Sequence, residues 1–170
     1  SIMMIRPANP TLRLILSILF LSLCEGTIVN IPEEYSTIQE AIDASEDGDT
    51  IRVSSGIYNE NINYNGKDII LESISGADET IIEGVGGQYV VTGSDHGKIM
   101  GFTITSDSLD QKGITAVGAF EITTNIIRNL ESDGIYCFTN NTSIIYNNII
   151  YQNNGTGIIG FVQPAGPIIR

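Results

Sequence analysis

The segment KIMGFTI at residues 98–104 recurs as EITTNII at 121–127 and again as IIYNNII at 144–150, a period of 23 residues. One period later the chain ends in PIIR at 167–170. A repeat this short cannot bury an apolar face by itself, so each copy must stack on the next. The repeat therefore predicts an elongated solenoid.

Three sets of apolar positions recur, and each set predicts one strand per coil. Two sets are spaced by 23 residues, and the glycines that mark the third are spaced by 21 and 23. Their members are Ile99, Ile122, Ile145 and Ile168; Ile81, Ile104, Ile127 and Ile150; and Val91, Ile114, Ile135 and Ile158. Three short strands per ~23-residue coil predict an all-β parallel β-helix. A propeller blade needs ~40–50 residues, about twice this period.

Asn125 and Asn148 occupy one position of the repeat, just before the second strand, where the first copy has Phe102. Asn tolerates the left-handed backbone region and bonds to its own backbone. Stacked Asn side chains can also bond to one another along a solenoid. We therefore expect a structural corner at Asn125 and Asn148 rather than a ligand site.

A short helix is expected near the start of the solenoid. Ser36 and Gln39 fit a capping box, and Ile38, Ala41 and Ile42 fall on one helical face. The helix should span about residues 37–45 and precede the first strand, at residues 51–53. In that position it would cover the open end of the core.

The first 26 residues resemble a secretory signal peptide. An apolar run at residues 14–24 follows Arg6 and Arg13, and it is shorter than the ~20 residues needed to span a bilayer. Cleavage before Thr27 would leave a β-helix domain of residues 27–170 without a membrane span. Cys137 would then be the sole cysteine, which is expected to be a core residue. A buried N-terminal helix and lipid attachment at Cys24 are the alternatives.

The charge of the chain restricts its partners. The formal net charge is −12, and residues 27–170 hold 19 acidic against six basic side chains. Such a surface repels nucleic acid and anionic membranes, so neither is an expected partner. It also disfavours polyanionic sugars unless bound calcium changes the local charge.

Three segments resemble the opening of secreted right-handed parallel β-helix proteins of the pectin-lyase-like superfamily. They are IPEEYSTIQEAIDA at 31–44, GDTI at 48–51 and GIYNE at 56–60. Cell-surface β-helix repeat proteins share this opening, and pectin methylesterases share it in looser form. The resemblance covers about residues 28–170 and implies a right-handed coil. It implies less about activity, because this fold hosts esterases, lyases, hydrolases and non-catalytic proteins.

The catalytic patterns of those enzymes are not matched here. Gln111 and Arg128, with Asp107 and Asp110, are the nearest counterparts of the esterase residues, but they lie outside the local patterns of the family, so no catalytic residue is assigned. Asp107 and Asp110 could form part of a calcium site, calcium being the one cofactor considered. A solvated corner loop is the alternative.

An outward stripe is the best candidate for contact with a carbohydrate. Arg128 and Asn129 in one coil match Tyr151 and Gln152 in the next, after Thr105 and Ser106 in the coil before. A tyrosine ring can stack on a sugar, and the amide and guanidinium groups can bond to its hydroxyls. An ordinary solvated strand face is the alternative.

Two Asn-X-Thr triplets, which place Asn140 and Asn154 in expected corners, fit the pattern for N-glycosylation.

Together these features predict an exported, non-catalytic β-helix module, secreted or at the cell surface, that acts as a scaffold or binds a polysaccharide or cell-surface glycan. The alternative is the N-terminal part of a polysaccharide-active enzyme whose active site lies on coils beyond residue 170. The register favours further coils, because the chain ends within an expected strand. A third, weaker interpretation is calcium-dependent adhesion.

Overall fold

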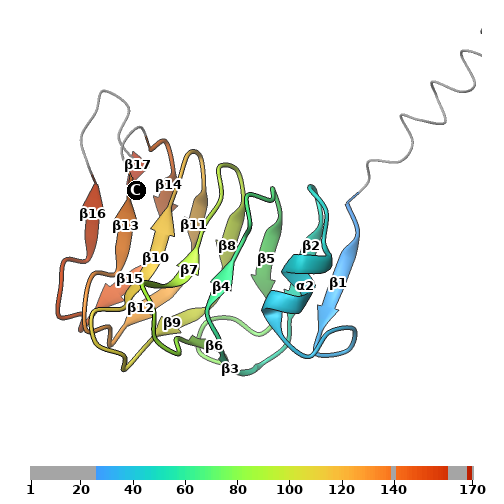
Figure 1. Ribbon diagram of the computed structural model, residues 1–170, viewed down its shortest axis with the longest axis horizontal. Coiled ribbons are helices and arrows are strands. Elements are labelled where there is room, and N and C mark those ends of the chain that lie inside the picture. Colours follow the sequence, from blue (N-terminus) through green and yellow to red (C-terminus); the bar gives the residue numbers. More distant parts are fainter. Residues whose placement is uncertain (1–25, 139–140, 161–167, 170) are drawn as a thin grey trace, which may run out of the picture.

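The computed structural model describes residues 26–138, 141–160 and 168–169, and the chain winds there as a right-handed parallel β-helix (Figure 1). Each complete coil contributes one strand to each of three sheets, and all pairings are parallel. Sheet A contains β1 (Ile28–Ile31), β2 (Thr50–Val53), β5 (Ile70–Ser73), β8 (Lys98–Met100), β11 (Glu121–Thr123), β14 (Ile144–Tyr146) and β17 (Ile168–Ile169). Sheet B contains β3 (Gly56–Asn59), β6 (Thr80–Glu83), β9 (Thr103–Thr105), β12 (Ile126–Arg128) and β15 (Ile149–Tyr151). Sheet C contains β4 (Ile62–Asn63), β7 (Tyr89–Thr92), β10 (Lys112–Ala116), β13 (Ile135–Cys137) and β16 (Ile158–Gly160).

The three predicted registers are confirmed through the central coils. The pairs Ile99–Ile122, Ile127–Ile150 and Ile114–Ile135 are partners in sheets A, B and C. Two predicted positions are wrong by one residue: Ile82, not Ile81, pairs with Ile104, and Ile169, not Ile168, pairs with Ile145. The corners absorb these single-residue changes in coil length, because a slip within a strand would turn its apolar side chains outward.

The glycines of the third register have a steric explanation. A Cβ atom on Gly113 would lie 2.4 Å from the carbonyl oxygen of Gly134 in the next coil. A Cβ atom on Gly134 would lie 2.6 Å from the carbonyl oxygen of Gly157. Stacked coils approach so closely at this corner that a side chain would push them apart.

The helix α2 (Ile38–Ala44) occurs as predicted, but its capping box begins one residue later. Thr37, not Ser36, is the N-cap: its hydroxyl accepts from the Glu40 amide at 3.2 Å, and the Glu40 carboxylate accepts from the Thr37 amide at 3.3 Å. Glu40 takes the role expected of Gln39 because a carboxylate is the stronger acceptor at a helix N-terminus. Gln39 instead bonds to the backbone of Asn63 in the next coil.

The helix is not the first element of the solenoid, contrary to expectation. Strand β1 precedes it and pairs with β2 along its whole length. Within the first coil, α2 contacts β1, β2 and β4, and it takes the place that later coils fill with strands of sheets B and C (Figure 1). The sequence signal for β1 was missed because its four residues carry no repeat partner at a spacing of 23.

The predicted asparagine corner is confirmed as a hydrogen-bonded ladder. Asn125 is 1% exposed, and its Oδ1 accepts from the Phe102 amide at 3.0 Å. Asn148 Oδ1 in turn accepts from the Asn125 amide at 2.9 Å. The left-handed backbone lies one residue earlier than expected, at Thr124 and Asn147, with φ near 54° and 56°.

Inside the solenoid, one continuous apolar core runs from the helix to the last coils. Among the described residues, no helix is long and apolar enough to cross a membrane.

Candidate functional site

The outer face of sheet B carries the stripe predicted to contact carbohydrate. Arg128 and Tyr151 are neighbours in register on β12 and β15. Asn129 and Gln152 follow them at the corner, each with φ of 54°, and both are exposed. These four residues therefore form one column, as expected, whereas Ser106, the matching residue one coil earlier, is 1% exposed and is not part of the surface.

The outward positions of sheet B form two stripes. The polar stripe consists of Asn59, Glu83, Thr105, Arg128 and Tyr151. The aliphatic stripe consists of Ile57, Ile81, Thr103, Ile126 and Ile149, and it was not recognised in the sequence. Its end members Ile57 and Ile149 are 61% and 59% exposed, which is unusual for isoleucine.

Gln111 serves as a structural staple at the corner between sheets B and C. It is fully buried, and its Nε2 donates to Asn61 Oδ1 at 2.9 Å and to the Gly86 carbonyl at 2.8 Å. Its Oε1 accepts from the Ser106 hydroxyl at 2.6 Å. This amide links three successive coils and has no face open to a substrate, so Gln111 is not arranged as a catalytic group.

The two residues predicted to bind calcium lie in the loop that Gln111 anchors. Asp107 and Asp110 are both exposed, and Asp110 has a positive φ of 60°. Across the part of the chain that the structure describes, no three His, Cys, Asp or Glu side chains are grouped so that they could hold a metal ion. Calcium binding at Asp107 and Asp110 stays a prediction.

The outer face of sheet C carries an aromatic cluster that the sequence analysis missed. The rings of Tyr136 and Phe138 meet edge to face, with centroids 5.3 Å apart, and the rings of Tyr89 and Tyr136 lie 6.3 Å apart at 49°. Phe138 is 42% exposed. Lys112 lies next to Tyr89 in register on the same face. We call Tyr89, Tyr136 and Phe138 the aromatic cluster.

The arrangement of this cluster follows from strand geometry. Cys137 points into the core, as predicted, and burial raises the pKa of its thiol to about 11. Tyr136 and Phe138 flank Cys137 and so point outward, because side chains alternate across a strand. Burial and then the neighbouring Tyr136 raise the pKa of Tyr89, so that its phenol is neutral at physiological pH. The alternation around Cys137 was the available sequence signal, but Tyr89 lies two coils away and gave none.

The outer face of sheet A contains ion pairs and a shallow hollow. Glu121 accepts from Lys98 Nζ and from the Tyr146 hydroxyl, both at 2.7 Å, beside a hollow of about 450 Å³ that Ile144 and Asn147 also line. Burial works against ionisation of Glu121, but these two bonds outweigh it and lower its pKa. The carboxylate is thus ionised and already engaged, which suits a structural role.

Of the two predicted glycosylation sites, Asn154 is exposed in a corner, where its side chain donates to Glu131. Asn140 lies outside the described residues, as does the predicted signal peptide up to residue 25. Modification of either asparagine stays a prediction.

Comparison with known proteins supports the fold and leaves the activity open. No protein-family model and no curated protein matches the sequence. A pectin methylesterase from carrot has a similar structure, with a TM-score of 0.50 and 15% identity over 74% of this chain and 52% of the esterase. The fold is therefore the parallel β-helix of the pectin-lyase-like class, and the chain spans about half the length of that esterase.

Proposed function

We propose that this protein is a β-helix module that binds a glycan through the aromatic cluster on sheet C. The single observation that supports this function most strongly is the grouping of three aromatic rings on an outer face, with Phe138 42% exposed. Exposed aromatic rings held by a rigid sheet suit the apolar faces of sugars, and neighbouring phenol and ammonium groups suit sugar hydroxyls.

The sheet itself gives this surface its rigidity. Tyr136 lies on β13, which pairs with β10 on one side and β16 on the other, so its backbone cannot shift independently. A preformed surface loses less conformational entropy when a ligand binds. The sequence-predicted stripe on sheet B offers one ring, Tyr151, beside an aliphatic stripe, and for this reason we place the glycan on sheet C.

The charge of the chain favours an uncharged ligand. A net charge of −12 repels polyuronates at long range, and Lys112 is a single cation beside the cluster. We infer a neutral polysaccharide, or one whose carboxylates are esterified, as the ligand class. The pectin methylesterase similarity makes methyl-esterified pectin a rational member of the test panel.

The test is isothermal titration of the purified protein with neutral glucans and xylans, methyl-esterified pectin and polygalacturonate. Tyr136→Ala should weaken binding of the best ligand about tenfold, since truncating a central aromatic residue costs at least about 1–2 kcal/mol. Tyr151→Ala is the matched control on sheet B and should leave the affinity unchanged. Loss of binding with Tyr151→Ala but not with Tyr136→Ala would move the site to the predicted stripe and refute the cluster.

A second candidate function is a role as part of a polysaccharide-active enzyme. It is favoured by the observation that this chain matches half of the carrot esterase. The active site would then lie on coils beyond residue 170. Assays of the protein for pectin de-esterification, eliminative cleavage and hydrolysis test this alternative, and any turnover would overturn a purely binding role.

Export and calcium complete the proposal. The N-terminal segment supports secretion or display at the cell surface, which detection of mature protein starting at Thr27 would test. Calcium-dependent adhesion would require Asp107 and Asp110, and it predicts a rise in melting temperature at millimolar calcium that Asp107→Asn abolishes. Absence of any shift would argue against it.

A further inference from the structure

We propose that the outer face of sheet B is a self-complementary surface on which two copies of this chain pair. Sheet B lies along the lower edge of the molecule in Figure 1, on a different face from the aromatic cluster. The inference concerns the aliphatic and polar stripes, so it does not depend on glycan binding. It rests on the order of residues along these stripes.

The aliphatic stripe leaves apolar area exposed along the whole sheet. Ile57 and Ile149 are 61% and 59% exposed, and Ile81 and Ile126 between them are partly exposed. At ~4.8 Å between strands, the five positions extend over about 20 Å. A flat apolar row of this length on a sheet is typical of a contact surface.

The middle of the face introduces no unsatisfied polar group. Thr103, the central member of the aliphatic stripe, is 2% exposed, and its hydroxyl donates to the Ala77 carbonyl at 2.7 Å. A partner that covered this position would therefore leave no new donor without an acceptor. Thr105 beside it is small and partly exposed.

The polar stripe carries opposite charges at equal distances from its centre. Glu83 lies one coil before Thr105 and Arg128 one coil after it. Among the described residues, neither side chain forms an ion pair, since the salt bridges there are Arg52–Glu72 and Lys98–Glu121. The two charges are ~9.6 Å apart along the stack, too far to pair within one chain.

A twofold axis parallel to β9 satisfies both stripes at once. With two copies face to face, this axis places Glu83 opposite Arg128 of the second copy, and Arg128 opposite Glu83. It also places Ile57 opposite Ile149 and Ile81 opposite Ile126, so aliphatic positions meet only aliphatic positions. An axis along the solenoid would instead bring Glu83 against Glu83, which charge repulsion disfavours.

The small area of the face sets the strength of the pairing. Five short strands present less surface than the ~1,200 Å² of total burial typical of stable complexes, so the dimer should be weak and form in the micromolar range. The partner is committed as a second copy because the charge order is complementary to itself.

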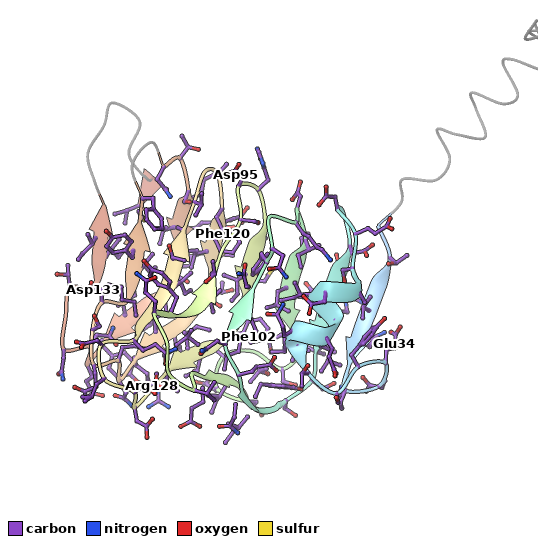
Figure 2. The ribbon with its side chains drawn as sticks, in the orientation of Figure 1. Glu34, Asp95, Phe102, Phe120, Arg128 and Asp133 are labelled. Carbon is purple, nitrogen blue, oxygen red and sulfur yellow. The ribbon has the colours of Figure 1, made fainter. Side chains whose placement is uncertain are left out.

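The experiment is sedimentation equilibrium of the purified full chain across the micromolar range, on the original sequence and three variants. Glu83→Arg should raise the dimer dissociation constant at least about tenfold, because it places Arg opposite Arg128. The double variant Glu83→Arg/Arg128→Glu restores the opposite charges and should restore the dimer. Asp95→Arg makes the same charge change at an exposed position on the opposite side of the molecule from Arg128 and should have no effect (Figure 2).

Circular dichroism of each variant separates loss of pairing from loss of folding. A folded Glu83→Arg variant that loses the dimer, together with rescue by the double variant, supports the proposal. A monomer at every concentration of the original sequence overturns it. A dimer that Glu83→Arg leaves unchanged, or that the double variant fails to restore, overturns it as well.

Discussion

At the scale of single residues, the corners carry more information than the strands. Gly101, Thr124 and Asn147 occupy one corner position in successive coils, and all three have a positive φ, of 79°, 54° and 56°. Gly and Asn adopt this region at low cost, whereas a β-branched residue does not. Thr124 is therefore a strained member of an otherwise well-suited column.

Replacement of Thr124 by Gly should stabilise the protein by about 1 kcal/mol, because the exposed side chain contributes little packing and its backbone strain is relieved. Chemical denaturation followed by circular dichroism measures the change. Thr50→Gly, the same substitution within strand β2, should destabilise the protein. If both variants lose stability, the corner is not strained at Thr124.

At the scale of elements, the capping helix depends on one lysine from the following coil. Lys67 Nζ donates to the carbonyls of Ile42, Asp43 and Ser45 at 2.7, 2.8 and 2.7 Å. These groups end the helix α2, whose last turn contains no basic residue of its own. The ammonium thus satisfies orphan carbonyls and opposes the negative end of the helix dipole.

Lys67→Met should destabilise the protein by about 1.5–3 kcal/mol, the usual range for hydrogen bonds to a charged group. Lys112→Met is the matched control, because the Lys112 ammonium forms no hydrogen bond among the described residues, and we expect a change within about 0.5 kcal/mol. Thermal and urea unfolding of both variants measure the difference. Equal effects of the two substitutions would show that Lys67 is not a helix cap.

The strands could be predicted from the sequence and the corners could not, for a physical reason. An inward position must be apolar in every coil, so Ile99, Ile122 and Ile145 reveal their strand by repetition. Corners may gain or lose a residue without changing the core, which is why Ile82 and Ile169 were each misplaced by one. The aromatic cluster joins side chains from coils that are not adjacent, and only the structure brings them together.

At the scale of the whole molecule, excess negative charge has to be held by local bonds. The Asp49 carboxylate accepts from the amides of Glu46 and Thr27, and these bonds lower its pKa below 3.8 despite partial burial. The pKa of Glu121 is also lowered from its ordinary value of 4.5, with Lys98 as its main partner. Each carboxylate therefore favours the folded state when it is ionised.

Stability should fall as the pH drops below about 4.5. A carboxylate whose pKa is lower when folded stabilises the protein above its unfolded pKa, and this contribution disappears as the pH falls through the folded value. Melting temperatures between pH 7 and pH 3 measure the effect. Asp49→Asn should melt earlier at pH 7 and lose less on acidification; an identical pH profile for Asp49→Asn would refute the role of Asp49.

The parallel stacking of the sheets also determines how the molecule responds to mechanical force. Each coil is bonded only to the coils before and after it, as the pairing of β8 with β5 and β11 shows. Tension applied at the two ends of the chain would load one coil at a time rather than the whole core. The described solenoid should therefore extend under force by the peeling of successive coils, each of which releases a similar length of chain.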